Sequence, residues 1–418
     1  MVSTEQKHVT ILGAGVVGVC CALKLLRDGH KVLLVDKGFP GSGCSSGNAG
    51  VLASGSFVPH SIPGLYKSIP KMLFNSLGPL SVRWRDLPSL MPWLFKFFLN
   101  GKLKIVDSNT QALSFLTLNS EEEHFKLARG TDAERFLERR MFLSVYDGEA
   151  AFMSDNYVWE LKRLYGANVV EYKGPEVFEI EPALSPRFTH MRGITGAGVC
   201  RDPEAYVRAL YEVFLAEGGQ FKLCHVRDIE IGPAGPRRLI SDDIVIDVSC
   251  LVVATGAFSN YFVKLLGSSV PLIGERGYHV MVKEPGVRLT NTILLESGKF
   301  VMTSMMDGMR LAGTSEFASI DAMPNWSRAK MIEKLGQEAL PGLRLDNTSR
   351  WMGHRPTLPD SLPVIGRSPK YENVFFAFGH QHIGLTCAPK TGELIAALII
   401  GREPNIDISK FDVSRFMS

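Results

Sequence analysis

A chain of 418 residues is too long for one core of ordinary size, so we expect two domains of roughly 100 to 200 residues each. Hydrophobic residues make up 45% of the chain and charged residues 21%, which excludes a disordered protein. The net charge of +3 and the scattered distribution of lysine and arginine argue against nucleic acid as a partner.

The seven cysteines include no CxxC pair and no metal-ligand spacing. We therefore expect free thiols, a reducing compartment and no bound metal. No basic region followed by an apolar one precedes Gly13, so we expect no secretory signal. No apolar run reaches the ~18 residues of a membrane-spanning helix. These features together predict a cytoplasmic protein.

The first predicted element is a strand at residues 9–12, which is apolar and β-branched throughout and is followed at once by three glycines. Gly13, Gly15 and Gly18 have GxGxxG spacing. The first permits a tight turn, the second lets the backbone approach a pyrophosphate, and the third lets the next helix pack closely. The N-terminal N–H groups of that helix and its positive dipole end would face the phosphates.

A second strand, at residues 31–35, ends in Asp36, whose carboxylate can accept hydrogen bonds from ribose hydroxyls. Strand, glycines, helix, strand and acid thus occur in the order that a dinucleotide site requires. The acid would repel a 2′-phosphate, which disfavours NADP and leaves NAD or FAD. A strand–helix–strand packing unit without a ligand is the alternative.

Residues 38–53 are crowded with glycine and serine and cannot form a regular element. We interpret this stretch as a second cradle for the phosphates or ring of the cofactor. Its N–H and hydroxyl donors would come from Ser45, Ser46, Gly47, Asn48 and Ala49. A flexible surface loop is the alternative.

From residue 59 to residue 103, prolines separate short apolar helical pieces; they are Pro63, Pro70, Pro79, Pro88 and Pro92. The most apolar piece is 88–99, in which Lys96 stands among aromatic residues and Lys102 and Lys104 follow. A stripe of this kind is more often core than membrane surface, so we predict core. Peripheral contact with lipid is the alternative.

Three elements are predicted next: a long amphipathic helix at 113–137, a strand at 141–145 and a helix at 153–165. Asp202 then reads as the N-cap of a helix that has Pro203 at its first position and ends after Glu217. The three elements at 113–137, 141–145 and 153–165 predict the first half of a second domain.

The helix that starts at Pro203 leads into a strand at 221–226, which would continue a doubly wound sheet. Strands at 243–248 and 250–254 follow. The second of these stops at Thr255 and Gly256, which are small enough to let the backbone pass close to a ligand.

The C-terminal stretch ENVFFAFGHQHIGLTCAPKTGELIA adds a strand that ends in glycine. Together with the N-terminal GxGxxG and the central strand that ends ATG, it resembles the FAD-dependent amine and amino-acid oxidoreductases related to glycine oxidase, sarcosine oxidase and D-amino-acid oxidase. The stretches GCSSGNAG and WMGHRPTLPDSLPVIG are most similar to bacterial D-amino-acid dehydrogenases. The resemblance runs from Val9 to about Ile400.

This resemblance implies a Rossmann-type, glutathione-reductase-like α/β domain for FAD and an interleaved α+β substrate domain built on an antiparallel sheet. The FAD-binding domain would comprise 1–60, 200–270 and 350–418, and the substrate domain 61–199 and 271–349. It also implies that Val226 contacts adenine through its backbone. The family usually has Glu where this chain has Asp36, so the shorter side chain could reach the ribose through water.

The predicted strand at 373–378 ends at Gly379, and a helix begins near Leu385 and runs to about Ile400. The N-terminus of this helix could stabilise negative charge on the N1 and O2 edge of a reduced flavin. His380, Gln381 and His382 lie where the flavin ring would be. They could contact flavin or substrate, or be ordinary polar loop residues.

Arg355 is the predicted substrate residue, because guanidinium binds a carboxylate through two parallel hydrogen bonds. The resemblance to glycine oxidase implies the same role, and an ordinary surface ion pair is the alternative. A strand at 274–279 would direct Arg276, Tyr278 and His279 toward the same cavity. Tyr278 could cap the substrate or be a buried structural tyrosine.

The predicted catalytic residues are Arg355, Tyr278 and His380. The predicted cofactor contacts are Gly13, Gly15, Val16, Val17, Gly18, Asp36, Lys37, Ser45, Ser46, Gly47, Asn48, Ala49, Gly50, Val226, Thr255, Gly256, Gly379, His380, Gln381, His382, Ile383, Gly384, Leu385 and Thr386.

We expect FAD-dependent oxidation of a D-amino acid or cyclic D-imino acid, such as D-proline or hydroxy-D-proline. Flavin performs the hydride chemistry, so the protein needs only to orient the substrate and favour a neutral amine. Electrons would pass to a quinone or another non-oxygen acceptor. An oxidase that uses O₂ and a non-catalytic FAD-binding subunit are the alternatives, and both a homo-oligomer and a hetero-oligomer are compatible with the sequence.

Overall fold

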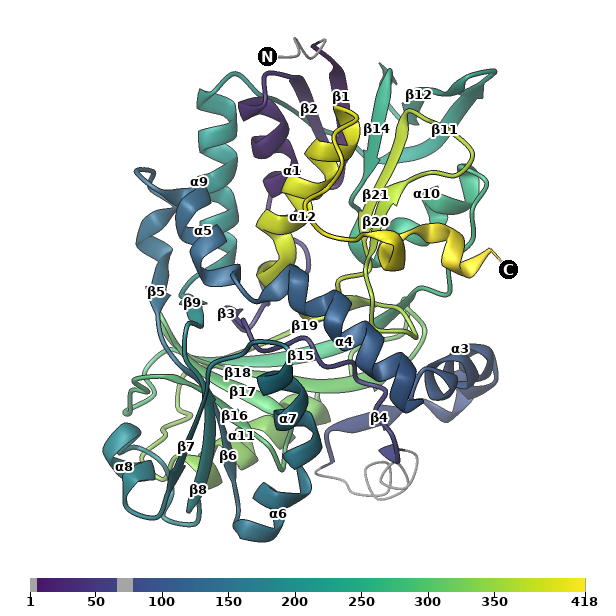
Figure 1. The fold of residues 1–418 in the computed structure, drawn as a ribbon. Helices are drawn as coiled ribbons and strands as arrows, with labels where there is room; N and C mark the ends of the chain where they lie inside the picture. The colour runs from purple at the N-terminus through teal and green to yellow at the C-terminus, as the bar shows by residue number, and fades with distance from the viewer. Residues whose placement is uncertain (1–5, 66–77, 418) are drawn as a thin grey trace.

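Two large sheets form the framework of the protein, one above the other in the view of Figure 1. The computed structural model describes residues 6–65 and 78–417, so Pro70 of the proline-spaced segment lies outside the described residues. One sheet has six strands and the other has nine. Among the residues described, none of the helices combines the length and the apolar character needed to cross a bilayer.

The six-stranded sheet has the order β10 (Gln220–Leu223), β2 (Lys31–Asp36), β1 (His8–Leu12), β14 (Cys250–Val253), β21 (Val374–Phe378) and β20 (Val364–Arg367). Its strand pairs are parallel except for β20 with β21. Central strands β1 and β14 are apolar because both faces of this sheet are covered. The predicted Rossmann-type sheet is therefore confirmed, although it is not doubly wound, because a layer of helices covers only one of its faces.

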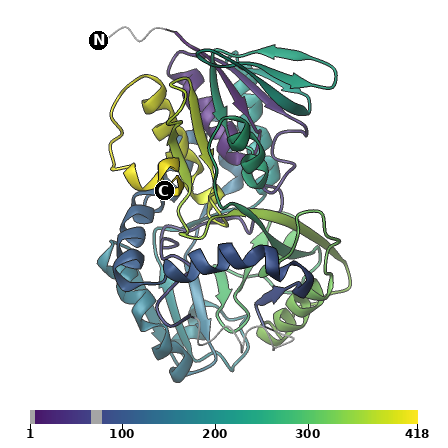
Figure 2. The same ribbon diagram turned by 90° about the vertical axis from the view of Figure 1, so that its right-hand side faces the viewer.

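Helices cover one face of the six-stranded sheet, and a small sheet covers the other (Figures 1 and 2). The helices are α1 (Val16–Arg27), α5 (Ser120–Ala128), α9 (Pro203–Ala216) and α12 (Gly384–Ile399). The opposite face carries β11 (Val226–Gly232), β12 (Gly235–Ser241), β13 (Val245–Asp247) and α10 (Ser259–Leu265). Asp202 caps α9 as predicted, because its carboxylate accepts a hydrogen bond from the N–H of Ala205 at 3.0 Å.

The nine-stranded sheet has the order β19 (Thr348–Thr357), β15 (Ile273–Val282), β18 (Gly308–Phe317), β17 (Phe300–Met305), β16 (Thr292–Leu295), β6 (Phe142–Tyr146), β8 (His190–Ile194) and β7 (Val169–Lys173), with β4 (Leu80–Val82) beside β18. Its pairs are antiparallel except β6 with β16 and β4 with β18. Helix α11 (Ser327–Ala339) packs against β15 and β18. The predicted second sheet is thus present and mainly antiparallel.

The remaining regular elements lie around these sheets. They are the small sheet of β3 (Val51–Leu52), β9 (Gly198–Cys200) and β5 (Leu137–Arg139), and the helices α3 (Leu87–Leu99), α4 (Leu103–Thr117), α6 (Glu149–Ser154), α7 (Asn156–Leu164) and α8 (Glu176–Ile180). The division into two domains stays a prediction. Residues 350–357, which we assigned to the cofactor domain, lie on β19 of the nine-stranded sheet.

The single helix predicted at 113–137 is wrong. The chain forms the end of α4, then α5, a 3₁₀ turn and β5. Three glutamates at 121–123 favour a new helix N-terminus there, and Gly130 follows α5 with a left-handed φ of 71°. The helix predicted at 153–165 is likewise broken at Asp155, whose carboxylate accepts a hydrogen bond from the Tyr146 hydroxyl at 2.9 Å.

The prediction that residues 88–99 belong to the core is also wrong. These residues form most of α3, in which only Leu90 and Trp93 are buried. The apolar stripe is wider than the surface against which the helix packs, so Phe95 remains 64% exposed.

A buried histidine joins three helices beside the six-stranded sheet. His124 of α5 is fully buried, and its Nε2 donates to the carbonyl of Leu385 in α12 at 2.8 Å. Its Nδ1 must then accept a hydrogen bond, which the Tyr206 hydroxyl of α9 donates at 2.7 Å. Burial lowers the pKa of His124 to about 4, so the ring is neutral at pH 7.

We expect Tyr206→Phe to lower the free energy of unfolding by about 1 to 3 kcal/mol, because Nδ1 of His124 would be buried without a donor. Tyr211→Phe on the same helix is the matched control, since Tyr211 is only partly buried and should change stability by less than about 0.5 kcal/mol. Chemical denaturation measures both. Equal losses in the two variants would contradict the role of the buried hydrogen bond.

Candidate active site

The glycine turn after β1 packs as closely as the motif predicts. A Cβ on Gly13 would lie 2.4 Å from the carbonyl oxygen of Ala254, and a Cβ on Gly18 would lie 1.8 Å from that of Gly13. Gly15 differs, because the nearest atom to its Cβ would be Oγ of Ser45 at 3.4 Å. The turn therefore needs Gly13 and Gly18 for packing, whereas the backbone at Gly15 stays open to a ligand.

Asp36 holds this turn together. Its Oδ2 accepts a hydrogen bond from the N–H of Ala14 at 2.6 Å, and its Oδ1 accepts one from Gly38 at 3.0 Å. The neighbouring Lys37 places Nζ 4.1 Å from the ring centre of Phe258. The contact of Asp36 with a ribose stays a prediction, and the structure adds a second role for its carboxylate.

The glycine- and serine-rich stretch lies directly against the first turn. Oγ of Ser45 accepts a hydrogen bond from the N–H of Val16 at 3.0 Å, which joins the two predicted cradles at the start of α1. Asn48 accepts from the N–H of Gly50 at 2.8 Å, and a Cβ on Gly50 would lie 2.3 Å from the carbonyl oxygen of Cys200. We refer to residues 44–50 as the cradle loop.

The nine-stranded sheet supports the cradle loop from below through a buried guanidinium. Arg310 of β18 donates from Nη1 to the carbonyls of Ser46 at 2.9 Å and Asn48 at 2.5 Å. His279 of β15 donates from Nδ1 to the carbonyl of Gly47 at 3.1 Å. Three successive carbonyls of the loop are thus held by two side chains of the other sheet.

Trp351 completes this contact. Its ring stacks on His279 with centroids 5.1 Å apart, and a Cβ on Gly47 would lie 2.2 Å from it. Burial lowers the pKa of His279 to about 3, with a further contribution from Arg310, so the imidazole is neutral. Burial also lowers the pKa of Arg310 to about 10, which leaves the guanidinium charged at pH 7.

The register between β15 and β19 defines one face of the sheet, which we call the site face. Glu275 pairs with Arg355, Gly277 with Gly353, and His279 with Trp351. Because side chains alternate along a strand, these six residues project to the same side. The two glycines leave room for their large neighbours: a Cβ on Gly277 would lie 2.4 Å from Nη2 of Arg355, and one on Gly353 2.0 Å from the ring of Trp351.

Arg355 is held by one edge and leaves the other edge free. Its Nη1 donates to Oε1 of Glu275 and to the carbonyl of Thr314, both at 2.8 Å, and its Nη2 donates to the carbonyl of Gly313 at 3.4 Å. Two successive carbonyls can reach it because Thr314 has a φ of 55°, which interrupts the strand alternation. Nε makes no hydrogen bond with the residues that the structure describes.

Glu275 orients Arg355 and is itself fully bonded. Its Oε1 also accepts from the Ser315 hydroxyl at 2.5 Å, and its Oε2 accepts from Thr357 at 3.0 Å. Burial alone would raise the pKa of the Glu275 carboxyl, but the charge and hydrogen bond of Arg355 and the Ser315 hydroxyl act in the opposite direction, so the pKa is lowered. The carboxylate is therefore charged at pH 7 and fixes the plane of the guanidinium.

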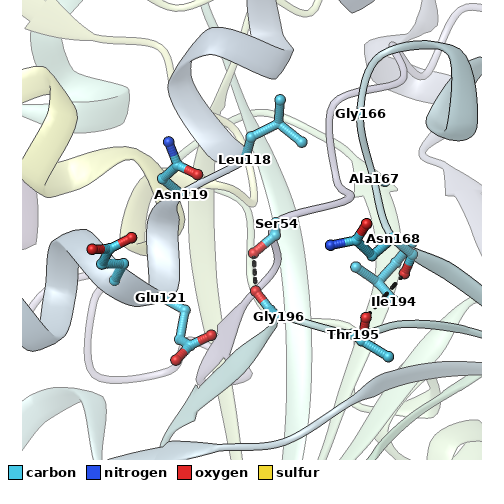
Figure 3. Close-up of a pocket in the computed structure, with 11 residues that line it drawn as sticks. Ser54, Leu118, Asn119, Glu121, Gly166, Ala167, Asn168, Ile194, Thr195 and Gly196 are labelled. Atoms are coloured by element: carbon cyan, nitrogen blue, oxygen red, sulfur yellow. Dashed lines mark hydrogen bonds between the residues drawn. The ribbon is translucent and has the colours of Figure 1, made fainter.

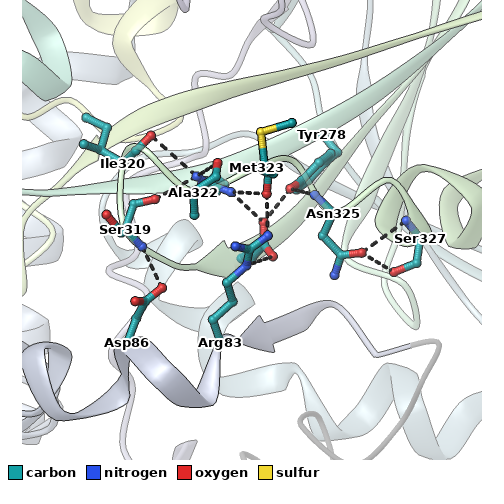
Figure 4. A network of polar contacts seen from close by, with 11 residues as sticks. Arg83, Asp86, Tyr278, Ser319, Ile320, Ala322, Met323, Asn325 and Ser327 are labelled. Carbon is teal, nitrogen blue, oxygen red and sulfur yellow. Dashed lines mark hydrogen bonds and ion pairs between the residues drawn. The ribbon is translucent and has the colours of Figure 1, made fainter.

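The strand alternation corrects the prediction that Arg276, Tyr278 and His279 face one cavity. Tyr278 lies on the opposite side from His279, is 1% exposed, and donates its hydroxyl to Glu316 (Figure 4). The same hydroxyl accepts from the N–H of Asn325 at 2.8 Å. Arg276 is also buried there and donates to the carbonyl of Ser319 at 2.7 Å. Tyr278 thus has the place of a buried structural tyrosine.

The three polar residues after β21 have different surroundings. His380 is 2% exposed and its Nε2 bonds to the Thr391 hydroxyl of α12 at 3.0 Å, so it packs into the helix. The N–H of Gln381 donates to the carbonyl of Pro356, next to Arg355, at 3.1 Å. His382 pairs through Nδ1 with Nε2 of His60 at 3.0 Å.

The His60–His382 pair belongs to the surroundings of Arg355. Desolvation by the surrounding protein lowers the pKa of His382 well below its ordinary value, and His60 and the charge of Arg355 lower it further. Desolvation likewise raises the pKa of the Cys44 thiol to about 11, although the charge of Arg355 acts in the opposite direction. The imidazoles and the thiol near the guanidinium are therefore neutral at pH 7, although His60, His382 and Cys44 are each exposed to solvent on one side.

Other predicted contacts are placed as follows. Thr255 lies beside the glycine turn, since a Cβ on Gly13 would be 3.0 Å from its nitrogen. Thr386, at the start of α12, donates its hydroxyl to the carbonyl of Val51 at 3.2 Å, just past the cradle loop. Val226 is buried at the start of β11. Gly256 and Gly379 both have a positive φ. The cofactor contacts of these residues stay predictions.

The sequence analysis missed Glu275, Arg310, Trp351 and His60 as members of this site. Glu275 lies in the stretch 274–279, in which Arg276, Tyr278 and His279 were selected. If the register of this strand against the strand of Arg355 were known, Glu275 would be recognised as the residue opposite Arg355. Arg310 and His60 stand alone in their segments and carry no motif. Only the fold brings them to the cradle loop and to Arg355.

A separate small cavity of about 190 Å³ lies between α4, α5 and the ends of β7 and β8 (Figure 3). Its wall is made partly by Ser54, whose hydroxyl donates to the carbonyl of Gly196 at 2.6 Å. Polar residues Asn119, Asn168 and Thr195 also line it. It contains none of the predicted site residues, and we assign it no chemistry.

A Rossmann-type sheet, an open glycine turn and a guanidinium with one free edge define a dinucleotide-dependent enzyme. The chain matches the family model described as FAD dependent oxidoreductase (DAO) over residues 8–398, and it belongs to that family. It is 36% identical over 99% of its length to the whole of a D-amino-acid oxidase from Bradyrhizobium diazoefficiens. It is 30% identical to a D-amino acid dehydrogenase from Paramagnetospirillum magneticum, with 98% of this chain and 99% of the relative covered.

Solved structures confirm the fold. Glycine oxidase from Geobacillus kaustophilus is similar with a TM-score of 0.75 at 23% identity, covering 98% of this chain and 99% of that one. The protein is therefore an FAD-dependent oxidoreductase. The open backbone at Gly15 fits FAD, for which the glycine turn would hold the pyrophosphate, and Ser45 places the cradle loop beside that turn.

We expect Gly47→Ala to weaken FAD binding roughly tenfold or more, because its Cβ would overlap the ring of Trp351 and overpacking costs about 1 to 3 kcal/mol. Gly43→Ala is the matched control in the same loop region, since its Cβ would meet no atom within 4 Å. Fluorescence titration of the apoprotein with FAD measures both. Equal affinities would remove residues 44–50 from the cofactor site.

Proposed function

We propose that the protein oxidises a D-amino acid or a cyclic D-imino acid, such as D-proline or hydroxy-D-proline, and passes the electrons to a quinone or another non-oxygen acceptor. The observation that carries this proposal is the free Nε–Nη2 edge of Arg355 beside the cradle loop. Relatives named D-amino-acid oxidase and D-amino acid dehydrogenase, which match over nearly the whole chain, support a D-amino acid as the substrate.

Arg355 binds the substrate carboxylate through its free edge, with Glu275 keeping the guanidinium plane in place. Bound FAD supplies the hydride acceptor for the Cα–H. The charge of Arg355 and the neutral His60 and His382 favour a neutral substrate amine, whose lone pair forms the C=N bond as the hydride leaves. A clamp of this kind has no use in a non-catalytic FAD-binding subunit.

Two further assignments accompany this proposal. The seven cysteines of the chain are all free in the structure, which supports the cytoplasm as the compartment. An oxidase that uses O₂ is the second candidate function. The observation in its favour is the name of the relative from Bradyrhizobium diazoefficiens at 36% identity.

We expect Arg355→Met to lower kcat/KM while FAD stays bound, by a factor that corresponds to a loss of on the order of 2 to 5 kcal/mol of transition-state stabilisation. Arg355→Lys should lose far less. The Met variant also leaves Glu275 without its partner, so the double variant Glu275→Gln, Arg355→Met separates the two effects. If Arg355 binds substrate, the double variant stays inactive. Recovery of activity in the double variant would show that Arg355 serves only to neutralise Glu275.

We expect a panel of D- and L-amino acids, proline analogues and sarcosine to show turnover of the D-forms with an artificial dye and little peroxide with O₂. The free edge of Arg355 serves any α-carboxylate, so stereochemistry and acceptor need direct measurement. Turnover confined to L-amino acids or glycine would contradict the stereochemical part of the proposal. Peroxide formed as fast as the dye is reduced would make the protein an oxidase.

A further inference from the structure

Helix α3 is attached to the protein through one side only. Leu90 and Trp93 are its two buried residues, and the Trp93 ring lies 5.6 Å from that of Phe317 at the end of β18. The Ser61 hydroxyl also donates to the carbonyl of Phe97 at 2.6 Å. These contacts fix the orientation of the helix on the nine-stranded sheet.

The outer side of α3 is equally apolar. Met91 is 52% exposed, Phe95 64%, Phe98 40% and Leu99 42%. The first three are spaced four and three residues apart and so lie on one side of the helix, and Leu99 adjoins Phe98. Leu103, which begins α4, extends the patch and is 61% exposed. A helix that is apolar on all sides is normally buried in a core or in a membrane. Figure 1 shows α3 at the right-hand edge of the molecule, with no other labelled element beyond it.

The charges within this segment, between Asp86 and Asp107, have one sign. From residue 87 to residue 106 the chain has three lysines, Lys96, Lys102 and Lys104, and no aspartate or glutamate. All three lysines are exposed. Basic residues beside an apolar helical face are the pattern of segments that lie on anionic lipid, where each lysine near the surface adds attraction.

A cleft of about 590 Å³ opens beside the patch, between α3, α4 and the C-terminal segment. Lys96 and Leu99 of α3 line it, and Lys410 faces them from the C-terminal segment. The lining is mixed, and its one carboxylate, Asp360, is paired with Arg415, so Lys96 and Lys410 leave the cleft with a net positive charge that suits an anionic headgroup.

The patch is also close to the candidate active site. Ser61, which bonds to Phe97, follows His60, and the N–H of His60 donates to the Ser361 hydroxyl at 3.2 Å. A surface bound to lipid here would bring the His60–His382 side of the site next to the bilayer. If the proposed function holds, a lipid-soluble electron acceptor would arrive at this side.

We propose that α3 and the first turn of α4 form a membrane-docking surface for anionic phospholipid. The helix, about 20 Å long, lies in the plane of the interface with Met91, Phe95 and Phe98 among the headgroups and acyl ends. Lys96, Lys102 and Lys104 contact the lipid phosphates. This is a surface contact, held by one exposed helical face and by charge.

The test is flotation of the FAD-loaded protein with vesicles of phosphatidylcholine, alone and mixed with phosphatidylglycerol. We expect the wild type to float with the mixed vesicles and to be released by salt. The double variant Phe95→Ser, Phe98→Ser should bind roughly tenfold or more weakly, because it removes two aromatic groups from the interface. The triple variant Lys96→Gln, Lys102→Gln, Lys104→Gln should lose the preference for phosphatidylglycerol.

Leu164→Ser is the matched control, because Leu164 is 70% exposed at the end of α7 and lies outside the patch. It should float like the wild type, and FAD absorbance per protein should be unchanged in every variant. Flotation does not depend on catalysis, so a failure to bind vesicles can be distinguished from a failure of the proposed enzymatic function. Absence of flotation, or equal loss with Leu164→Ser, would overturn the proposal. A change from dimer to monomer in the phenylalanine variant without vesicle binding would assign the face to a second copy instead.

Discussion

The contact between Arg310 and the cradle loop is the interaction on which the arrangement of the two sheets depends. Arg310 is 8% exposed, and its guanidinium binds the carbonyls of Ser46 and Asn48. Asp202 and Glu204 stabilise the charge only from a distance. A buried charge that bonds to backbone carbonyls demands that those carbonyls stay in place, because losing them costs several kcal/mol. The cradle loop is therefore positioned by the sheet that carries Arg355.

Arg355 depends on the same pair of strands, β15 and β19, as the contact of Trp351 with the cradle loop. Gly277 and Gly353 face each other across β15 and β19, and each leaves space that a side chain would fill. The guanidinium of Arg355 lies over one glycine and the ring of Trp351 over the other. Trp351 in turn contacts Gly47 of the cradle loop, so a change at either glycine would move both the clamp and the cofactor cradle.

Local patterns were sufficient to predict the cofactor half of the protein. The glycine spacing, the Asp202 cap and the short apolar strands are each encoded within a few residues, and the structure forms them where we expected. The helix predicted at 113–137 failed because that prediction rested on amphipathic spacing, which continues across the break, and not on the local signals for it, three glutamates at 121–123 and Gly130. The core assignment of 88–99 failed because composition measures apolar area and does not count the surfaces available to cover it.

The substrate half could not be predicted to the same depth, because its residues meet only through strand register and a bulge. Arg276, Tyr278 and His279 are neighbours in sequence, yet alternation sends His279 to the site face and the other two into a buried network with Glu316. Glu275, one residue earlier, lies on the site face and bonds to Arg355. If the direction of one side chain on β15 were known, strand alternation would assign all four residues to their faces of the sheet.

The charges on the site face explain why an anionic group is needed to complete it. Glu275 neutralises one guanidinium, Arg355, whereas Arg310 has no carboxylate in direct contact within the described part of the chain. His279 contributes no charge, because burial and Arg310 lower its pKa to about 3, and desolvation, His60 and Arg355 lower the pKa of His382. The face therefore carries excess positive charge, which is screened least at the buried Arg310. If Arg355 binds the substrate as proposed, a carboxylate on its free edge offsets that excess whereas an ammonium adds to it, so the same electrostatics would favour loss of the proton from the substrate amine.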